Sequence, residues 1–423
     1  MRHNMKKSAL YSLVLVLFLS CVSAYSQDIT QLKVEGGHNS KRQQKKPYVI
    51  LISADGFRYD YATKYQADHL LAMGKQGVVA AAMRPSFPSV TFSNHYTIVT
   101  GLYPSHHGLV NNSFYDRARN ESYSMGKKDK VQDGSWYGGT PLWVLAGQQQ
   151  MMSASMFWVG SEAAVKGVRP SYYYNFNDSM PVDQRIQAVK DWLLLPEAER
   201  PHLITFYLSD ADHAGHSYGP DSPQTEAAVH RVDSIVNALT NAVEETGLPV
   251  NFIFVSDHGM TAVDRDHPIR MPSAIDTSRF IIPSSGTMLV LYAKDSADIR
   301  PTYEALKKQE DHFRVYLKDN MPAELHYGKK DDLDNRIGDI LLIPEWPYVF
   351  SERRPGMGYH GFSPLKVKEM GATFIAWGPA FKKGIQIPEF ENVNIYPLVA
   401  GILGLKYSGP IDGTKKVLKN ILK

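Results

Sequence analysis

Short, uninterrupted runs of apolar residues constrain the fold of this chain most strongly. The clearest run, Tyr48–Ala54, contains a single serine among its seven residues. A strand with one face in water alternates polar and apolar residues, whereas a continuous apolar run is typical of a strand buried on both faces. Runs of the same kind recur at Ser153–Val159, Leu203–Leu208, Asn251–Ser256, Met288–Tyr292, Ile337–Ile343 and Thr373–Trp377.

Helical patterns fall between these runs. The clearest helix is expected to begin at Ser222-Pro223, because Ser caps a helix and Pro suits its first position. Apolar residues then recur with a period of 3.6 until the pattern ends near Gly247. An apolar helix is also expected at Asn394–Leu405.

Strands that alternate with helices predict an α/β fold with a mostly parallel central sheet and helices on both faces. Residues 262–360 carry more proline and charge and predict a small inserted lobe. We therefore expect a single domain over residues 47–423, with ligands at the carboxyl ends of the parallel strands.

The N-terminal segment has the features of an export signal. A basic start precedes an apolar run, Ala9–Val22, that is shorter than the roughly 20 residues of a membrane span. We predict a signal peptide over residues 1–26, a polar linker over 27–46, and export to the periplasm or secretion. A lipid anchor at Cys21 is the less favoured alternative.

Cysteine use and charge restrict the chemistry of the exported chain. Cys21 is the only cysteine, so any metal site in the rest of the chain must use His and carboxylate ligands. Without the signal, 43 basic residues balance 43 acidic ones, which argues against a broad polyanion-binding surface. No nucleic-acid-binding module and no transmembrane segment after signal removal are expected, and the sequence identifies no protein partner.

A proline-rich loop turns into a short amphipathic helix within the stretch Pro85–Pro104. Thr91 lies near that turn, where unpaired N–H groups and the helix dipole favour an alkoxide or a phosphate. A Thr at this position is also a common N-cap, which is the alternative interpretation.

Acidic and imidazole side chains follow several predicted strands or lie in a late glycine-rich loop. Such ligands suit zinc when a coordination position stays open. Asp212 and His216 are one helical turn apart, although spacing alone leaves Asp210 and His213 as alternatives. A further cluster, Asp264, Asp266 and His267, is interpreted as loop. The candidate ligands are Asp55, Asp212, His216, Asp257, His258 and His360.

Together, six segments resemble the nucleotide pyrophosphatase/phosphodiesterase family of the alkaline phosphatase superfamily, from about Pro47 to the C-terminus. They are Ser53–Arg58, Thr91–Pro104, His107–Asn112, Asp212–Pro220, Ser256–Met260 and Gly358–Gly361. The resemblance implies two zinc ions per chain and settles the choice of Asp212. It assigns Asp55, Thr91, Asp257 and His258 to the first ion and Asp212, His216 and His360 to the second.

The resemblance also implies a mechanism. Thr91 attacks phosphorus, water hydrolyses the resulting phospho-threonine, and a nucleoside 5′-monophosphate is released. Asn112 and the backbone N–H of Phe92 are expected to donate hydrogen bonds to the non-bridging oxygens.

Several positions of this chain match those that form the nucleotide pocket in the nucleotide-cleaving branch of the family. Phe176 replaces the tyrosine common there, and Tyr172, Tyr173 and Tyr174 are alternative stacking residues. Any one of these aromatics is equally explained as core. The matching positions are Phe92, Met125, Lys130, Trp158, Phe176 and Tyr207.

Three other functions are alternatives for this set of residues. A choline-phospholipid phosphodiesterase, of lysophospholipase C or D type, would use the same metals and nucleophile. A phosphomonoesterase would need a cation at the terminal phosphate, for which Arg84 is the only candidate near Thr91. A non-catalytic metal-binding protein would tolerate loss of a ligand or of the nucleophile, yet all eight proposed metal and catalytic positions are chemically competent.

Overall fold

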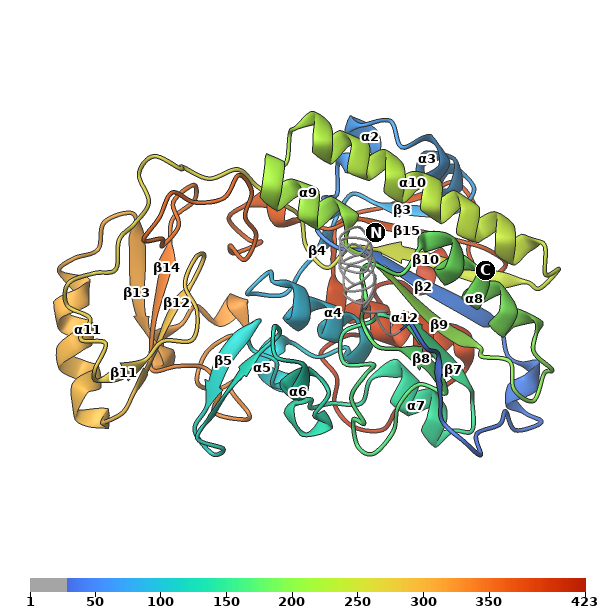
Figure 1. Ribbon diagram of the computed structural model, residues 1–423, viewed down its shortest axis with the longest axis horizontal. Coiled ribbons are helices and arrows are strands. Elements are labelled where there is room, and N and C mark those ends of the chain that lie inside the picture. Colours follow the sequence, from blue (N-terminus) through green and yellow to red (C-terminus); the bar gives the residue numbers. More distant parts are fainter. Residues whose placement is uncertain (1–28) are drawn as a thin grey trace, which may run out of the picture. The chain divides into compact units, whose positions relative to one another are not determined.

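The computed structural model describes residues 29–423 and confirms the predicted α/β fold (Figure 1). Within these residues, five of the eight strand pairs in the central sheet are parallel, so the sheet is mostly parallel. In spatial order its strands are β1 (Leu32–Lys33), β8 (Tyr172–Tyr174), β7 (Ser153–Met156), β9 (Leu203–Leu208), β2 (Tyr48–Ala54), β10 (Val250–Val255), β15 (Phe374–Trp377), β3 (Val78–Ala80) and β16 (Ile385–Ile387).

Both faces of this sheet are covered, which explains the continuous apolar runs. Val49 and Leu51 of β2 belong to one buried cluster, while Ile50 and Ile52 belong to another. The first cluster includes residues of α4 (Thr91–Thr100), α7 (Leu142–Gln148) and α12 (Ile395–Leu403), and the second includes residues of α3 (Asp68–Lys75), α8 (Val182–Leu194) and α10 (Pro223–Glu244). Figure 1 shows α3 and α10 on one side of the sheet and α7 and α12 on the other.

The start of α10 is capped as predicted. The hydroxyl of Ser222 accepts a hydrogen bond from the backbone N–H of Thr225 at 3.1 Å, and Pro223 takes the first helical position. The cap thereby satisfies one of the donors that every helix start leaves unpaired.

Two predicted strands lie outside the central sheet. Met288–Tyr292 and Ile337–Ile343 correspond to strands of a separate four-stranded sheet within residues 262–360, drawn in orange in Figure 1. Its strand order is β11 (Phe280–Ile281), β12 (Leu289–Ala293), β14 (Ile340–Pro344), β13 (Phe313–Leu317), and α11 (Ile299–Lys307) packs in the same cluster. Strands are buried in both sheets, so an apolar run in the sequence does not show to which sheet its strand belongs.

The segment predicted as a polar linker is instead partly built into the fold. The chain from Gln31 onward forms one compact unit, in which β1 pairs with β8. Asn39 is buried and donates hydrogen bonds to the carbonyl oxygens of Glu197 and Arg200. The predicted signal peptide lies outside the described residues.

Shorter elements complete the chain. No helix within residues 29–423 combines the length and apolar character that a bilayer crossing requires. The remaining elements include the paired strands β4 (Met83–Arg84) and β17 (Phe390–Glu391), the hairpin β5 (Ser113–Asp116) and β6 (Glu121–Ser124), and the helices α2 (Tyr61–Lys64), α5 (Pro104–His107), α6 (Lys128–Val131) and α9 (Asp210–Tyr218).

Candidate active site

Three adjacent parallel strands bring the predicted acidic residues to one edge of the sheet. β2 lies between β9 and β10 and is parallel to both. Asp55 follows β2 directly, Asp257 follows β10 after one residue, and α9 begins two residues after β9. Carboxyl ends of parallel strands meet at one edge, so these residues converge although they are far apart in sequence.

Thr91 is the first residue of α4, and it does not cap the helix. Val90 occupies the N-cap position, and no side chain makes a capping hydrogen bond there. The Thr91 hydroxyl instead lies 3.3 Å from Nε2 of His258. The structure therefore turns the hydroxyl towards the strand ends, at the positive end of the α4 dipole.

The first cluster combines Asp55, Asp257 and His258 around that hydroxyl. Nε2 of His258 lies 3.0 Å from Oδ2 of Asp257 and 3.5 Å from Oδ1 of Asp55. All three side chains are at most 2 % exposed. Burial together with the nearby carboxylates of Asp257 and Asp212 raises the pKa of Asp55 well above its usual range. Burial opposes ionisation of Asp257 too, but His258 and His95 outweigh it and hold the pKa of that carboxyl low.

The second cluster consists of Asp212, His216 and His360. Nε2 of His360 lies 3.1 Å from Nε2 of His216, and Oδ1 of Asp212 lies 3.4 Å from the latter atom. The two clusters adjoin, since the rings of His258 and His360 stack with their centroids 3.6 Å apart.

The alternatives that spacing left open point elsewhere. Asp210 pairs with Arg231 at 2.7 Å, and His213 is exposed, with its nearest acid at Asp178. The pair Asp264 and His267 lies apart on a loop, with most of the His267 side chain in solvent.

Two glycines allow the clusters to approach each other. Gly56 has φ of +66°, and a Cβ there would come within 2.9 Å of the Asp212 backbone. A Cβ at Gly358 would lie 2.4 Å from the carbonyl oxygen of Gly215, which would push the His360 loop away from α9. The glycines of the Asp-Gly and Gly-Tyr-His motifs are therefore needed for steric reasons, whereas Asp and His supply the chemistry.

The imidazoles are oriented for metal binding. Nδ1 of each ring faces a backbone carbonyl oxygen: His216 that of Gly358 at 2.9 Å, His258 that of Gly259 at 2.9 Å, and His360 that of Ser89 at 3.0 Å. A carbonyl only accepts, so Nδ1 carries the proton in each ring. In His360, burial and the neighbouring His258 and His216 also lower the pKa well below its usual range, which keeps that ring neutral.

Unpaired acceptors complete the case for cations. Oδ1 of Asp55, Oδ1 of Asp212 and Oδ2 of Asp257 are buried and have no hydrogen-bond partner among residues 29–423. Buried acceptors that face one another are costly unless a cation lies between them. The donor set of carboxylate oxygens and imidazole Nε2 atoms therefore fits divalent ions such as zinc.

Asn112 lies beside the nucleophile, but one predicted donor is occupied. The backbone N–H of Phe92 donates to Oδ1 of Asn112 at 2.9 Å, so it does not point freely at a substrate oxygen. The contact leaves the Asn112 amide nitrogen as the available donor, because Oδ1 is the accepting end of that amide.

The predicted substrate residues divide into exposed and buried ones. Phe176 and Met125 are exposed, and the ring of Phe176 lies edge-on to that of Tyr207, with centroids 6.0 Å apart. Tyr207 is nearly buried, and its hydroxyl donates to Oδ2 of Asp55 at 2.7 Å. Phe92 is half-buried and lies 6.4 Å from the ring of Tyr123.

Other substrate assignments are not supported by the packing. Trp158 is buried and donates from Nε1 to the carbonyl oxygen of His95, so it supports α4 from behind. The ammonium of Lys130 pairs with Glu121 and Asp129. Tyr172 and Tyr174 are buried in β8 and so cannot replace Phe176 as stacking surfaces.

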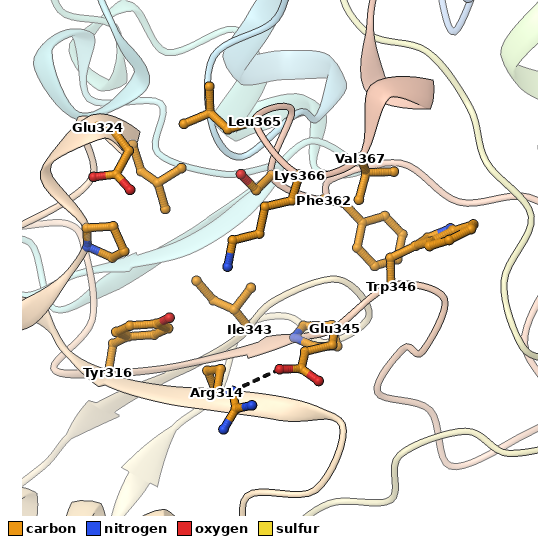
Figure 2. A pocket seen from close by; sticks show the side chains of 14 residues that line it. Arg314, Tyr316, Glu324, Ile343, Glu345, Trp346, Phe362, Leu365, Lys366 and Val367 are labelled. Atoms are coloured by element: carbon orange, nitrogen blue, oxygen red, sulfur yellow. Dashed lines mark hydrogen bonds and ion pairs between the residues drawn. The ribbon is translucent and has the colours of Figure 1, made fainter.

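A separate groove lies between the four-stranded sheet and residues 362–367 (Figure 2). It encloses about 360 Å³ and is lined by residues such as Tyr316, Trp346 and Lys366. None of the predicted site residues lines it, although Phe362 is two residues beyond His360.

Comparison with known proteins decides the family. The sequence profile described as type I phosphodiesterase/nucleotide pyrophosphatase matches residues 49–363. The chain belongs to this family. It is 36 % identical to mouse ectonucleotide pyrophosphatase/phosphodiesterase family member 1 over 402 residues, which is 90 % of this chain and 43 % of that protein. A venom phosphodiesterase of Crotalus durissus collilineatus is 33 % identical, covering 89 % of this chain and 46 % of its own.

Solved structures of the phosphodiesterase family share the fold. Murine ectonucleotide pyrophosphatase/phosphodiesterase 5 superposes with a TM-score of 0.83 at 27 % identity, covering 89 % of this chain and all of the other. An inactive threonine-to-alanine variant of the murine protein, in complex with AMP, has a TM-score of 0.84 at 26 % identity. The chain spans less than half the length of the curated phosphodiesterase relatives named above.

Two residues around this candidate site are not marked by the sequence patterns above. His95 is fully buried beside Asp257, and Glu162 accepts a hydrogen bond from the backbone N–H of Phe176 at 2.6 Å. His95 follows Thr91 by four residues, a helical spacing that pointed to the same face. No local pattern marks Glu162.

Tyr207→Phe should weaken zinc binding at the first cluster about tenfold, because it removes the hydrogen bond that orients Asp55. Burial raises the pKa of Tyr207 well above its usual range, so its hydroxyl stays a donor. Zinc competition with a chelating dye measures the effect. An unchanged affinity would show that Asp55 needs no such support.

Proposed function

We propose that this chain is a zinc-dependent nucleotide pyrophosphatase/phosphodiesterase, which releases nucleoside 5′-monophosphate through a phospho-threonine intermediate. The observation that carries the proposal is the Thr91 hydroxyl, 3.3 Å from His258 Nε2 and next to buried, unpaired carboxylate oxygens. Two zinc ions, when bound, would lower the pKa of the nucleophile and of a hydrolytic water and would neutralise phosphoryl charge.

Different residues of the chain would bind the metals, attack phosphorus and stabilise the developing charge. Asp55, Asp257 and His258 would hold one ion beside Thr91, and Asp212, His216 and His360 would hold the other. Thr91 Oγ1 would form the new bond to phosphorus while the bond to the leaving oxygen breaks. The amide nitrogen of Asn112 would donate to a non-bridging oxygen as charge builds there. Water would then cleave the Thr91 ester.

The substrate class follows from Phe176. Its ring is half exposed beside Tyr207, which offers a π-face to a nucleobase near the nucleophile. The AMP bound by the murine relative supports the same class. Arg84, the one candidate for recognising a terminal phosphate, pairs with Glu389 at 2.8 Å and Glu391 at 3.4 Å, which disfavours a phosphomonoesterase. Residues 1–26 are proposed to direct export.

The deciding experiment compares two chromogenic diesters on zinc-loaded protein. We expect faster hydrolysis of the p-nitrophenyl ester of thymidine 5′-monophosphate than of p-nitrophenyl phosphorylcholine. A preference for the choline ester would keep the proposed metals and nucleophile and would make the chain a choline-phospholipid phosphodiesterase. Hydrolysis of neither ester by zinc-loaded protein would contradict both.

Phe176→Ala should raise KM for the thymidine ester about tenfold, since stacking on one base is worth roughly 1–3 kcal/mol. The phosphorylcholine ester has no base, so its KM serves as the control and should stay unchanged. Initial rates over a range of substrate concentrations measure both. Equal effects on the two esters would show that Phe176 does not bind the base.

A further inference from the structure

His95 occupies a buried position that links the nucleophile helix to the first cluster. It lies on α4, is fully buried, and has polar neighbours on both ring nitrogens. Nδ1 lies 3.0 Å from the carbonyl oxygen of Thr91 and 3.3 Å from Oδ2 of Asp257. Nε2 lies 2.8 Å from the hydroxyl of Ser53, on β2. One ring therefore contacts α4, β2 and Asp257, which lies two residues beyond β10.

The contacts define the protonation of the ring. The carbonyl oxygen of Thr91 only accepts, so Nδ1 carries the proton and donates it there, while Oδ2 of Asp257 lies 3.3 Å from the same nitrogen. The Ser53 hydroxyl then donates to Nε2 when the ring is neutral. With both nitrogens engaged, His95 has no lone pair free for a metal, although it lies within reach of Asp55 and Asp257.

We propose that His95 is a positioning residue that fixes the Asp257 carboxylate relative to the Thr91 backbone. Asp257 Oδ1 is held by the backbone N–H of Gly56 at 3.2 Å, and Oδ2 lies 3.3 Å from Nδ1 of His95 and 3.0 Å from Nε2 of His258. The N–H of His95 donates to the carbonyl oxygen of Thr91, the first residue of α4, and the same edge of the ring attracts the anionic Oδ2 oxygen 3.3 Å away, which favours one orientation of the carboxylate. A metal ligand and the nucleophile are thus aligned by one group. The inference rests on the proposed zinc function.

The surroundings of His95 explain why the ring cannot turn away. Its faces and edges meet Trp158 and Tyr207, with centroid distances of 5.3 and 5.2 Å. Trp158 also donates to the His95 carbonyl oxygen at 3.1 Å. Packing therefore fixes the orientation of the His95 ring, and in this orientation its two nitrogens face their polar partners.

The test compares His95→Phe, which removes the N–H, with His95→Asn, whose amide can replace the donor at the Nδ1 position. We expect His95→Phe to weaken one of the two zinc sites about tenfold or more and to lower kcat by a similar factor, with KM for the thymidine ester nearly unchanged. His95→Asn should recover most of both losses. Zinc competition with a chelating dye and steady-state kinetics measure these effects.

His107 supplies a matched control. It is also a fully buried histidine that contacts α4, through Thr97 at 3.0 Å, and it touches none of the proposed ligands. His107→Phe should lower the thermal unfolding midpoint of zinc-free protein without changing zinc affinity. Equal zinc affinities in His95→Phe and His107→Phe would overturn the inference, as would a His95→Asn protein no better than His95→Phe.

A milder variant covers the case in which His95→Phe does not fold. Ser53→Ala keeps the ring but frees Nε2, and it should weaken zinc binding several-fold; wild-type zinc affinity in this variant would overturn the inference. A wild-type protein that binds no zinc would instead contradict the proposed function itself. The two failures are therefore distinguishable.

Discussion

Thr91→Ala is expected to lower kcat for the thymidine ester by about a thousandfold or more, because removal of a covalent nucleophile costs at least this much in comparable enzymes. The zinc content should remain at two ions per chain. Asp55, Asp257 and His258 would still hold the first ion, since three protein ligands suffice in catalytic zinc sites. Steady-state hydrolysis and metal analysis of the same preparation measure both quantities.

Thr91→Ser is the matched control, since it keeps the hydroxyl at the start of α4 and should retain most of the activity. Acid quenching during turnover, followed by peptide mass analysis, should find a nucleoside monophosphoryl group on Thr91 in the wild type and none in Thr91→Ala. Undiminished turnover in Thr91→Ala would place the nucleophile elsewhere.

His360→Ala is expected to reduce the zinc content from two ions to about one. It should also lower kcat about a hundredfold or more, because each zinc ion stabilises the charge of the transition state by several kcal/mol. His360 is the histidine that the late loop contributes to the second cluster, where its Nε2 lies 3.1 Å from that of His216. Metal analysis after dialysis and steady-state kinetics measure the losses.

His267→Ala provides the comparison for loss of a histidine outside the site. His267 pairs with Asp264 on an exposed loop, so its removal should change neither zinc content nor kcat. Two tightly bound zinc ions in the His360→Ala protein would mean that another residue completes the second cluster.

Local sequence was sufficient to predict those features that depend on a single strand or helix. The apolar run at Tyr48–Ala54 predicted β2 with its bounds, and Ser222-Pro223 predicted the start of α10. The convergence of Asp55 and Asp257 was predictable for the same reason, because a residue that follows a buried parallel strand lies at a known edge. A strand buried on both faces and a helix cap each depend on a few consecutive residues, so both can be recognised from the local sequence.

Packing between distant segments decided the rest. Trp158 and Lys130 have the residue types of a nucleotide pocket, yet one is buried against α4 and the other pairs with Glu121 and Asp129. The Phe92 N–H is occupied by an amide twenty residues away, and the run at Thr373–Trp377 is antiparallel to its neighbours. The sequence by itself determined which segments form buried strands and which types of side chain are candidates for metal binding. Only the tertiary structure decided which aromatic and charged groups remain free for a substrate, since exposure and pairing depend on contacts between residues far apart in the chain.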